Sequence, residues 1–280
     1  MAINRQYIIA IIFILNTLLS YGQISRTKLP DKIIPLDSTV RFGKLDNGFT
    51  YYLKYNDHPK GEVVMKMIVK AGRFHEDEDQ TEYAHLLEHV AVQDVEKYRD
   101  LVTVLKLNGI DHRAFTSRLA TRYILHIPNS NQEKLNLGLT VLKQWAGSIL
   151  IDSSRLDMHR GSILGELRST DAYRDDLYNR EGEIILRNTG FPPGDRNKST
   201  ENIKNLDINR LKDFYHDWYR PDLQAAIVVG SFNLDSLEKI IQNKFSKLTM
   251  PSNMRNTSKA IEKFDYQLTG ENQYETIKDT

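Results

Sequence analysis

The pentapeptide His85-Leu86-Leu87-Glu88-His89 combines residue types and a spacing that suit metal chemistry. In a helix, two residues four positions apart lie one turn above the other, so His85 and His89 would direct their imidazoles toward one point. Imidazole is a ligand that suits Zn²⁺. Glu88 follows His85 by three positions and projects near the same face, within reach of a metal-bound water. The pattern therefore predicts a metal site with an adjacent carboxylate.

A catalytic zinc site usually has three protein ligands and one open position. The chain contains no cysteine, so any further ligand must be a histidine or a carboxylate. Glu166 lies far along the chain on a second predicted helix, from which it could complete a set of two histidines and one glutamate. The alternative for an isolated glutamate is a solvated helix charge. The inverted His-x-x-Glu-His order itself occurs among the motifs of zinc peptidases.

The elements that must position these side chains are strands and helices in mixed order. Asn47-Gly48 separates two strand-like runs and is typical of a hairpin turn. Strands are expected at 40–45, 49–55, 62–71, 111–116, 121–127 and 224–230. Besides the His-bearing helix, helices are expected at 98–108, from the Asn131 cap onward, at 152–166, 177–186, 207–218 and 235–247. This order favours an α+β fold with a largely antiparallel sheet flanked by helices.

Composition sets broad limits on the function. The chain has 280 residues, of which 40% are hydrophobic and 27% charged, as expected for a globular protein with a sizeable core. The 38 basic and 37 acidic residues give a formal net charge of +1, which offers nothing to attract nucleic acid or an anionic membrane. The absence of cysteine also excludes disulfides and a cysteine nucleophile.

The first residues have the pattern of a targeting segment. Arg5 precedes an apolar run from Ile8 to Leu19, and Ser20-Tyr21-Gly22 supplies small residues for cleavage, which predicts a signal peptide at 1–22. A membrane anchor is the competing interpretation, but the run is too short to cross a bilayer core of about 30 Å. We therefore expect export to the periplasm or the extracellular space, a linker at 23–38, and no stable membrane span after cleavage.

Several ordered motifs resemble one family. The runs Ala71–Glu76 and Ala84–His89 are similar to the entry into the metal helix of the pitrilysin/insulinase family of zinc metallopeptidases, which includes the mitochondrial processing peptidases. Arg160-Gly161 followed by Glu166 resembles the run that carries the family's third ligand. Asp217–Asp222 followed by the strand 226–230 is also characteristic. The resemblance spans about one family domain and implies a catalytic N-terminal domain at 39–250.

The resemblance implies roles for individual residues. His85, His89 and Glu166 would hold one Zn²⁺ per domain, and Glu88 would be the general base in the hydrolysis of peptides or unfolded protein. The family binds its substrate extended along a sheet edge. The segment that matches this edge comprises Arg113, Ala114 and Phe115.

Two positions depart from the family pattern. Arg113 stands where the family commonly has an asparagine that contacts the substrate backbone, which puts that contact in doubt. His159 stands where the family often has a second glutamate, seven residues before the ligand glutamate. A neutral imidazole at this position could hydrogen-bond a ligand from the second coordination shell. The alternative is an exposed helix residue.

The family's enzymes enclose substrate between two similar halves, each of two domains. This chain is much shorter, and 251–280 is expected to be a linker and the start of a truncated second domain. The chain is then either a fragment of a longer enzyme or a subunit that needs a second half as partner. Its function is expected to be that of a zinc metalloendopeptidase, inactive alone if the second half is required. The alternative is a non-catalytic family domain that binds peptide or a partner half.

Overall fold

A computed structural model describes residues 35–169, 177, 180–182, 184, 195–253 and 276. The expected signal peptide, most of the expected linker at 23–38, half of the expected helical stretch at 177–186 and nearly all of 254–280 lie outside the described residues. The described secondary structure lies in one compact unit, Ser38–Thr280. Within the part of the chain that the structure describes, no helix has the length and apolar character needed to cross a membrane.

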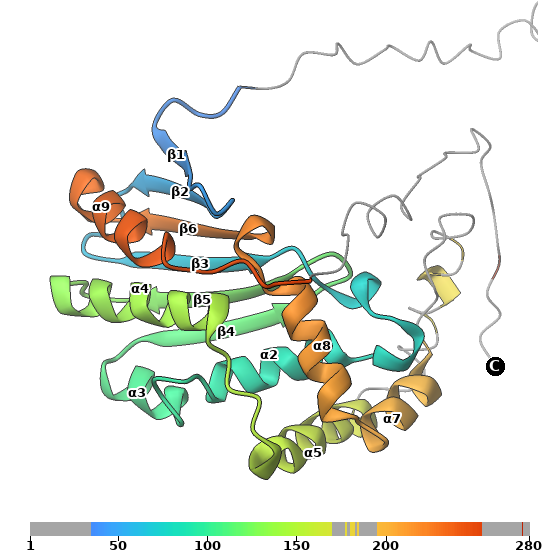
Figure 1. The fold of residues 1–280 in the computed structure, drawn as a ribbon. Coiled ribbons are helices and arrows are strands. Elements are labelled where there is room, and N and C mark those ends of the chain that lie inside the picture. The colour runs from blue at the N-terminus through green and yellow to red at the C-terminus, as the bar shows by residue number, and fades with distance from the viewer. Residues whose placement is uncertain are drawn as a thin grey trace, which may run out of the picture. The chain divides into compact units, whose positions relative to one another are not determined.

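One mixed sheet of six strands forms the centre of the fold, in the order β1-β2-β6-β3-β5-β4. Four of its five strand pairings are antiparallel, and the exception is the parallel pair β2–β6. The α+β fold with a largely antiparallel sheet is thus confirmed, and Figure 1 shows the arrangement. The strands are β1 (Val40–Lys44), β2 (Thr50–Tyr55), β3 (Val63–Val69), β4 (Asp111–Thr116), β5 (Thr121–Ile127) and β6 (Gln224–Gly230).

The expected hairpin at Asn47-Gly48 joins β1 and β2. Gly48 has φ +88°, a conformation that glycine adopts without steric cost. The side-chain amide of Asn47 donates to the carbonyls of Phe245 and Leu248 at 2.8 and 3.0 Å. The turn therefore connects this edge of the sheet to the end of the last helix.

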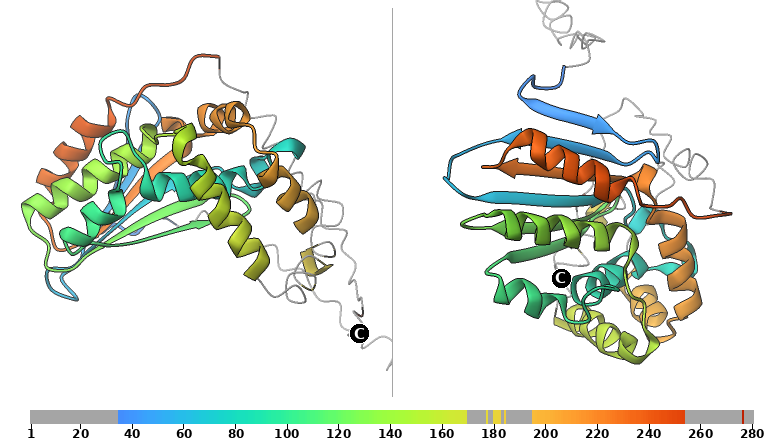
Figure 2. Two further views of the ribbon diagram at one scale, coloured as in Figure 1. Left: turned by 90° about the horizontal axis from the view of Figure 1, so that it is seen from below. Right: turned by 60° about the vertical axis from the view of Figure 1, so that its left-hand side comes forward.

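Much of the core lies between the sheet and two helices, α4 (Gln132–Gly147) and α9 (Leu234–Phe245). Alternate residues of the strands point into it, so that in β3 Val63, Met65, Met67 and Val69 are buried while the residues between them are partly exposed. Trp145 of α4 is fully buried, stacks on Tyr123, and donates its indole N–H to the carbonyl of Ala91. Figure 2 shows the helices against the sheet from two further directions.

Helix ends mostly follow the capping residues expected from the sequence. Asn131 accepts from the backbone N–H of Lys134, and Asp207 accepts from that of Asn209 at the start of α8 (Ile208–Trp218). The last helix, expected from 235, begins one residue earlier at Leu234, because Asn233 is its cap and accepts from the N–H of Ser236. One helix, α7 (Arg196–Lys204), was not predicted, since few of its side chains are buried.

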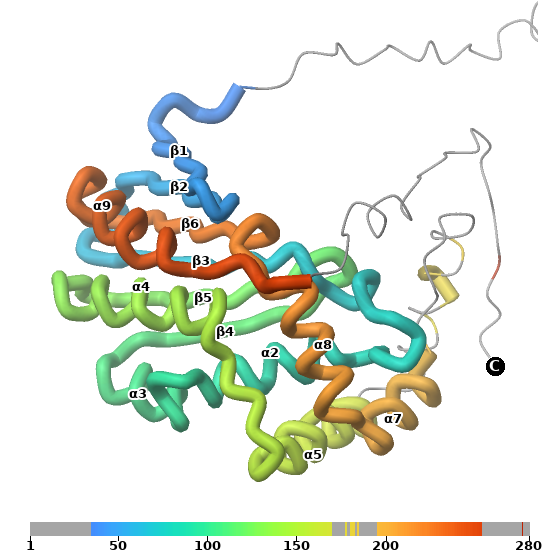
Figure 3. Tube along the Cα trace, viewed as in Figure 1, coloured from blue at the N-terminus to red at the C-terminus, as the bar shows by residue number. Residues whose placement is uncertain are grey.

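The remaining helices lie toward β4 and carry the chemistry described below. The tube in Figure 3 follows them from the end of β3 through two short turns into α2 and later into α5. They are the 3-10 helices η1 (Arg73–His75) and η2 (Glu78–Gln80), and the α-helices α2 (Tyr83–Gln93), α3 (Leu101–Leu107) and α5 (Ser153–Ser169). A further 3-10 turn, η3 (Pro221–Leu223), precedes β6.

The burial of His75, at the end of η1, should make the unfolding free energy depend on pH. Its ring packs edge-on against Trp218, its Nδ1 accepts from the N–H of Gly72, and burial lowers the pKa of its imidazole. The unfolded chain therefore takes up this proton at a higher pH than the folded chain. We expect the stability that comes from burying the neutral ring of His75 to be fully present above a pH of about 6.5. This stability is lost as the pH falls below that value, because the unfolded chain then gains a proton that the folded chain resists.

The variant His75→Gln tests this prediction, because an amide does not titrate and its oxygen can still accept from Gly72. Urea unfolding at a pH of about 7.5 and of about 5.5 should show a smaller pH-dependent change in unfolding free energy than in the wild type. His58→Gln, at a side chain that is 88% exposed, is the control. An unaltered pH dependence in His75→Gln would contradict the assignment.

Candidate metal centre

The orientation of α2 is set at its N-terminus by a carboxylate from the preceding turn. Glu76 accepts hydrogen bonds from the backbone N–H groups of Glu82 and Ala84, at 3.1 and 2.8 Å. These are among the donors that the first turn of a helix leaves without an intrahelical partner. Farther along, Leu86, Leu87 and other apolar residues of α2 are buried. The opposite side of the helix is thereby directed toward α5, with which it makes contact.

Three sequence-predicted ligands converge between α2 and α5. The Nε2 atom of His85 lies 3.4 Å from one carboxylate oxygen of Glu166, and Nε2 of His89 lies 3.3 Å from the other. The two imidazole rings stand edge to face, 4.9 Å between centroids. One potential ligand atom from each of the three residues lies within 4.8 Å of the others.

This donor set fits a zinc ion. Ligand atoms about 2.0–2.2 Å from a tetrahedral ion stand roughly 3.3–3.6 Å apart. The two N–O distances in the structure, each to a different oxygen of Glu166, are 3.4 and 3.3 Å. Two neutral imidazoles and a carboxylate are also a donor set used in catalytic zinc sites. The side chains of His85 and His89 are 18% and 21% exposed and that of Glu166 is 53% exposed, so the cluster is open to solvent on the α5 side.

Glu88 lies on α2 between the two histidines in sequence but in a more enclosed position. It is buried, and its carboxylate accepts a hydrogen bond of 2.6 Å from the hydroxyl of Thr116, at the end of β4. Burial raises the pKa of Glu88 above its ordinary value, and the Thr116 hydrogen bond opposes this shift. A carboxyl group with a raised pKa is better able to accept and return a proton near neutral pH.

Arg113, Ala114 and Phe115 lie on β4, which is an edge strand of the sheet. Arg113 and Phe115 are exposed, the latter by 49%, whereas Ala114 is partly buried against the core. An edge strand offers unpaired backbone groups to an extended peptide. Through Thr116, the same strand ends at the carboxylate of Glu88.

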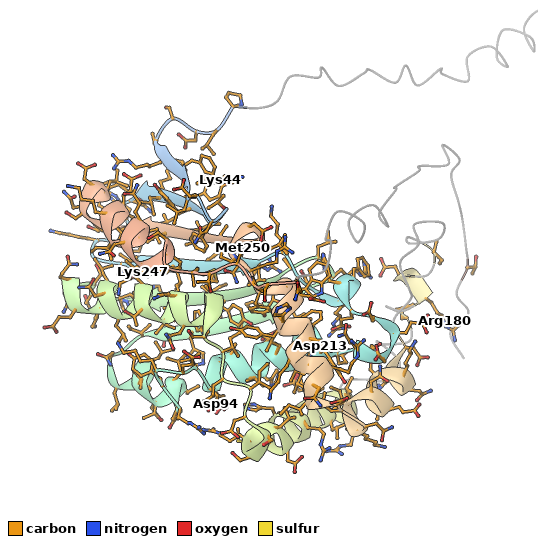
Figure 4. The ribbon with its side chains drawn as sticks, in the orientation of Figure 1. Lys44, Asp94, Arg180, Asp213, Lys247 and Met250 are labelled. Carbon is orange, nitrogen blue, oxygen red and sulfur yellow. The ribbon has the colours of Figure 1, made fainter. Side chains whose placement is uncertain are left out.

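His159, on α5, is buried rather than exposed, so the alternative of an exposed helix residue is wrong. Its Nε2 lies 3.0 Å from the carboxylate of Asp94, which follows the C-terminus of α2 and is labelled in Figure 4. Arg155 reaches the other oxygen of Asp94 at 2.8 Å. The hydrogen bond of His159 thus links α5 to the end of α2 and does not go to His85, His89 or Glu166.

Two residues near the site were not identified from the sequence. Thr116 holds Glu88, and a period-two strand pattern gives no sign that its hydroxyl meets a helix. Glu82 contacts His85 from a left-handed backbone conformation, which glutamate seldom adopts, so no residue preference marks the position. Both contacts form only when elements distant in sequence, or a special turn, come together.

Two sequence models of one peptidase family match this chain. A sequence model described as insulinase, peptidase family M16, matches residues 51–182, a range that contains His85, Glu88, His89 and Glu166. A second, described as the inactive domain of peptidase M16, matches residues 205–280. The four residues of the candidate site therefore lie in the range matched by the first of the two models, the one described as insulinase.

Individual relatives are named as proteases. A probable zinc protease PqqL of Haemophilus influenzae is 31% identical over 224 residues, covering 78% of this chain and 24% of that protein. A chloroplastic stromal processing peptidase of Arabidopsis thaliana is 29% identical over 219 residues, covering 75% of this chain and 16% of that protein. The chain therefore spans a quarter or less of the length of these relatives.

Solved structures show the same fold. The first half of the periplasmic protease PqqL from Escherichia coli superposes with a TM-score of 0.71 at 24% identity, covering 80% of this chain and 49% of that one. Pitrilysin superposes with a TM-score of 0.59 at 21% identity, covering 80% of this chain and 24% of that one. The two sequence models and the named relatives show that the chain belongs to the pitrilysin/insulinase family of peptidases, M16.

Proposed function

We propose that this chain is the metal-binding domain of an exported zinc metalloendopeptidase. The observation that carries the proposal is the convergence of His85, His89 and Glu166, with Glu88 beside them. Relatives named as zinc proteases support zinc as the ion. A zinc ion at such a site polarises a carbonyl and lowers the pKa of a bound water toward about 7.

The residues of the chain would divide the remaining work. His85, His89 and Glu166 would hold the ion. Glu88 would take a proton during attack on the peptide carbonyl and return it to the leaving amine. The hydrogen bond from Thr116 supports this role, because it fixes one carboxylate oxygen and leaves the other available.

An extended peptide would bind along β4. The support is the position of this strand at the sheet edge and its end at Glu88, which would bring the backbone of a bound peptide toward the metal ligands. Arg113 would contribute its backbone and a positive charge at this edge, and Phe115 an exposed apolar side chain. The substrates would be peptides or unfolded segments, since strand addition requires an extended chain.

The domain organisation is part of the proposal. We place the catalytic domain at 39–250, followed at 251–280 by a linker and the start of a second domain. The chain covers only part of each relative, which is consistent with a second half as partner, in the same longer chain or as a separate subunit. Export through a signal peptide at 1–22 agrees with the description of the E. coli relative as periplasmic.

Zinc content tests the metal site, and cleavage of unstructured peptides tests the reaction. We expect the purified wild-type chain to contain about one zinc ion. We also expect it to cleave peptides, either alone or after the second half is added. A chain that takes up no zinc would contradict the proposal. Zinc without any cleavage in either condition would favour the rival, a non-catalytic family domain that binds peptide or a partner half.

A further inference from the structure

Glu82 has an unusual backbone conformation immediately before the metal helix. Its φ of 75° and ψ of 4° lie in the left-handed region, which side chains other than glycine and asparagine seldom adopt. The other non-glycine residues with positive φ in the described part of the chain are both asparagines, Asn129 and Asn253. A glutamate in this conformation suggests that its side chain makes contacts that offset the backbone cost.

Capping of α2 does not account for the glutamate. Glu82 is the N-cap residue, but its side chain makes no capping hydrogen bond. The exposed donors of the first turn are taken instead by Glu76, through the N–H groups of Glu82 and Ala84. The Glu82 carboxylate is therefore directed elsewhere, although its side chain is only 5% exposed.

The contacts of the carboxylate converge on a metal ligand. One oxygen lies 3.0 Å from Nδ1 of His85 and 3.6 Å from the guanidinium of Arg73. The other accepts from the hydroxyl of Ser199, on α7, at 3.3 Å. Partners from η1, α2 and α7 thus fix the carboxylate of Glu82 in place. Because these partners compensate its charge and its lone pairs, the free-energy cost of burying the carboxylate is reduced.

The hydrogen bond determines which nitrogen of His85 can bind a metal. A carboxylate accepts but does not donate, so Nδ1 must carry the proton. In the neutral ring, which is the form that binds a metal, Nε2 then keeps its lone pair, and it is the nitrogen that faces Glu166, at 3.4 Å. A carboxylate on the far nitrogen of a ligating histidine fixes its tautomer and orientation and strengthens it as a donor.

We propose that Glu82 is a positioning residue of the metal site, which holds His85 in the tautomer and orientation that bind the ion. This inference rests on the proposed function, since it assumes that His85 is a zinc ligand. It adds a buried carboxylate to the second coordination shell, at the entrance of α2. The inference also connects α7 to the site, because the hydroxyl of Ser199 on this helix donates a hydrogen bond to the carboxylate of Glu82.

The variants Glu82→Gly and Glu82→Gln separate this role from a structural one. Glycine removes the carboxylate and relieves the left-handed backbone, whereas glutamine keeps the size and polarity of the side chain without its charge. Asn129→Gly is the matched control, since it relieves a left-handed position between β5 and α4 without touching the site. Zinc affinity is measured by competition with a chelator, and the unfolding free energy of the zinc-free protein by urea denaturation.

We expect Glu82→Gly to bind zinc about 10–100-fold more weakly than the wild type. Glu82→Gln should lie between them, and Asn129→Gly should match the wild type. In the zinc-free protein, ¹⁵N chemical shifts should show His85 protonated at Nδ1 in the wild type, and a gain of the Nε2-protonated form in Glu82→Gly. A purely structural role would alter the unfolding free energy and leave the tautomer unchanged.

Zinc affinity of both Glu82 variants within twofold of the wild type would overturn the proposal, and so would a wild-type His85 protonated at Nε2. If Glu82→Gly does not fold, the comparison of Glu82→Gln with the wild type decides. These outcomes leave the proposed function standing as long as the wild type binds zinc and cleaves peptides. A wild type without zinc would overturn both.

Discussion

The variant Glu88→Gln is expected to reduce kcat for peptide cleavage by about 10²–10⁴-fold while leaving zinc binding intact. An amide of nearly the same shape can still accept the hydroxyl hydrogen bond of Thr116, so the local structure should be kept. It has no basic oxygen to take a proton. The loss should therefore appear in kcat rather than in zinc content or stability.

The measurement compares wild type and variant on unstructured peptides, each with and without the second family half. Glu133→Gln is a matched control, because Glu133 is an exposed residue of α4 away from the site. Its activity should equal that of the wild type. Cleavage that survives in Glu88→Gln at the wild-type rate would show that another residue acts as the base.

Removal of a ligand is expected to have an equally large effect on the metal. In His89→Ala and in Glu166→Gln only two of the three protein donors remain, and we expect bound zinc to fall from about one ion to less than about 0.1 per chain after dialysis. Peptide cleavage should be lost with the metal. Because the side chain of Glu166 is 53% exposed, its substitution should leave the unfolding free energy of the zinc-free protein nearly unchanged.

Elemental analysis of dialysed protein checks this prediction, with His216→Ala and Glu201→Gln as controls on α8 and α7. Both controls should keep the wild-type zinc content. A chelator should likewise stop cleavage by the wild type, and added zinc should restore it. Retention of stoichiometric zinc by Glu166→Gln would remove Glu166 from the ligand set and leave a site that needs another third donor.

Much of the fold could be predicted because its signals are local. The alternation of buried residues in β3 and β5, the Asn47-Gly48 turn and the caps at Asn131 and Asp207 depend on neighbours within a few residues. The parallel pair β2–β6 could not be predicted in this way. It pairs residues 175 positions apart in the chain, such as Thr50 with Ala225, and nothing in either strand specifies its partner.

The same distinction applies to the candidate site. That His85, Glu88 and His89 share one side of a helix was predictable, because helical periodicity fixes the relative directions of residues three and four apart. The sequence also offered Glu166 as a candidate third ligand, and the resemblance to a family favoured this role over that of a solvated helix charge. Whether that glutamate meets the histidines depends on the packing of α5 against α2.

The surroundings of the cluster could not be predicted from the sequence. The folded structure pairs His159 with Asp94 rather than with His85, His89 or Glu166. It also places Thr116 on Glu88 and turns the backbone at Glu82 so that its carboxylate reaches His85. Each of these contacts depends on long-range packing or on a backbone conformation that the residue type disfavours. A local sequence pattern carries no information on either, so the helix with its two histidines was predictable and the shell that holds it was not.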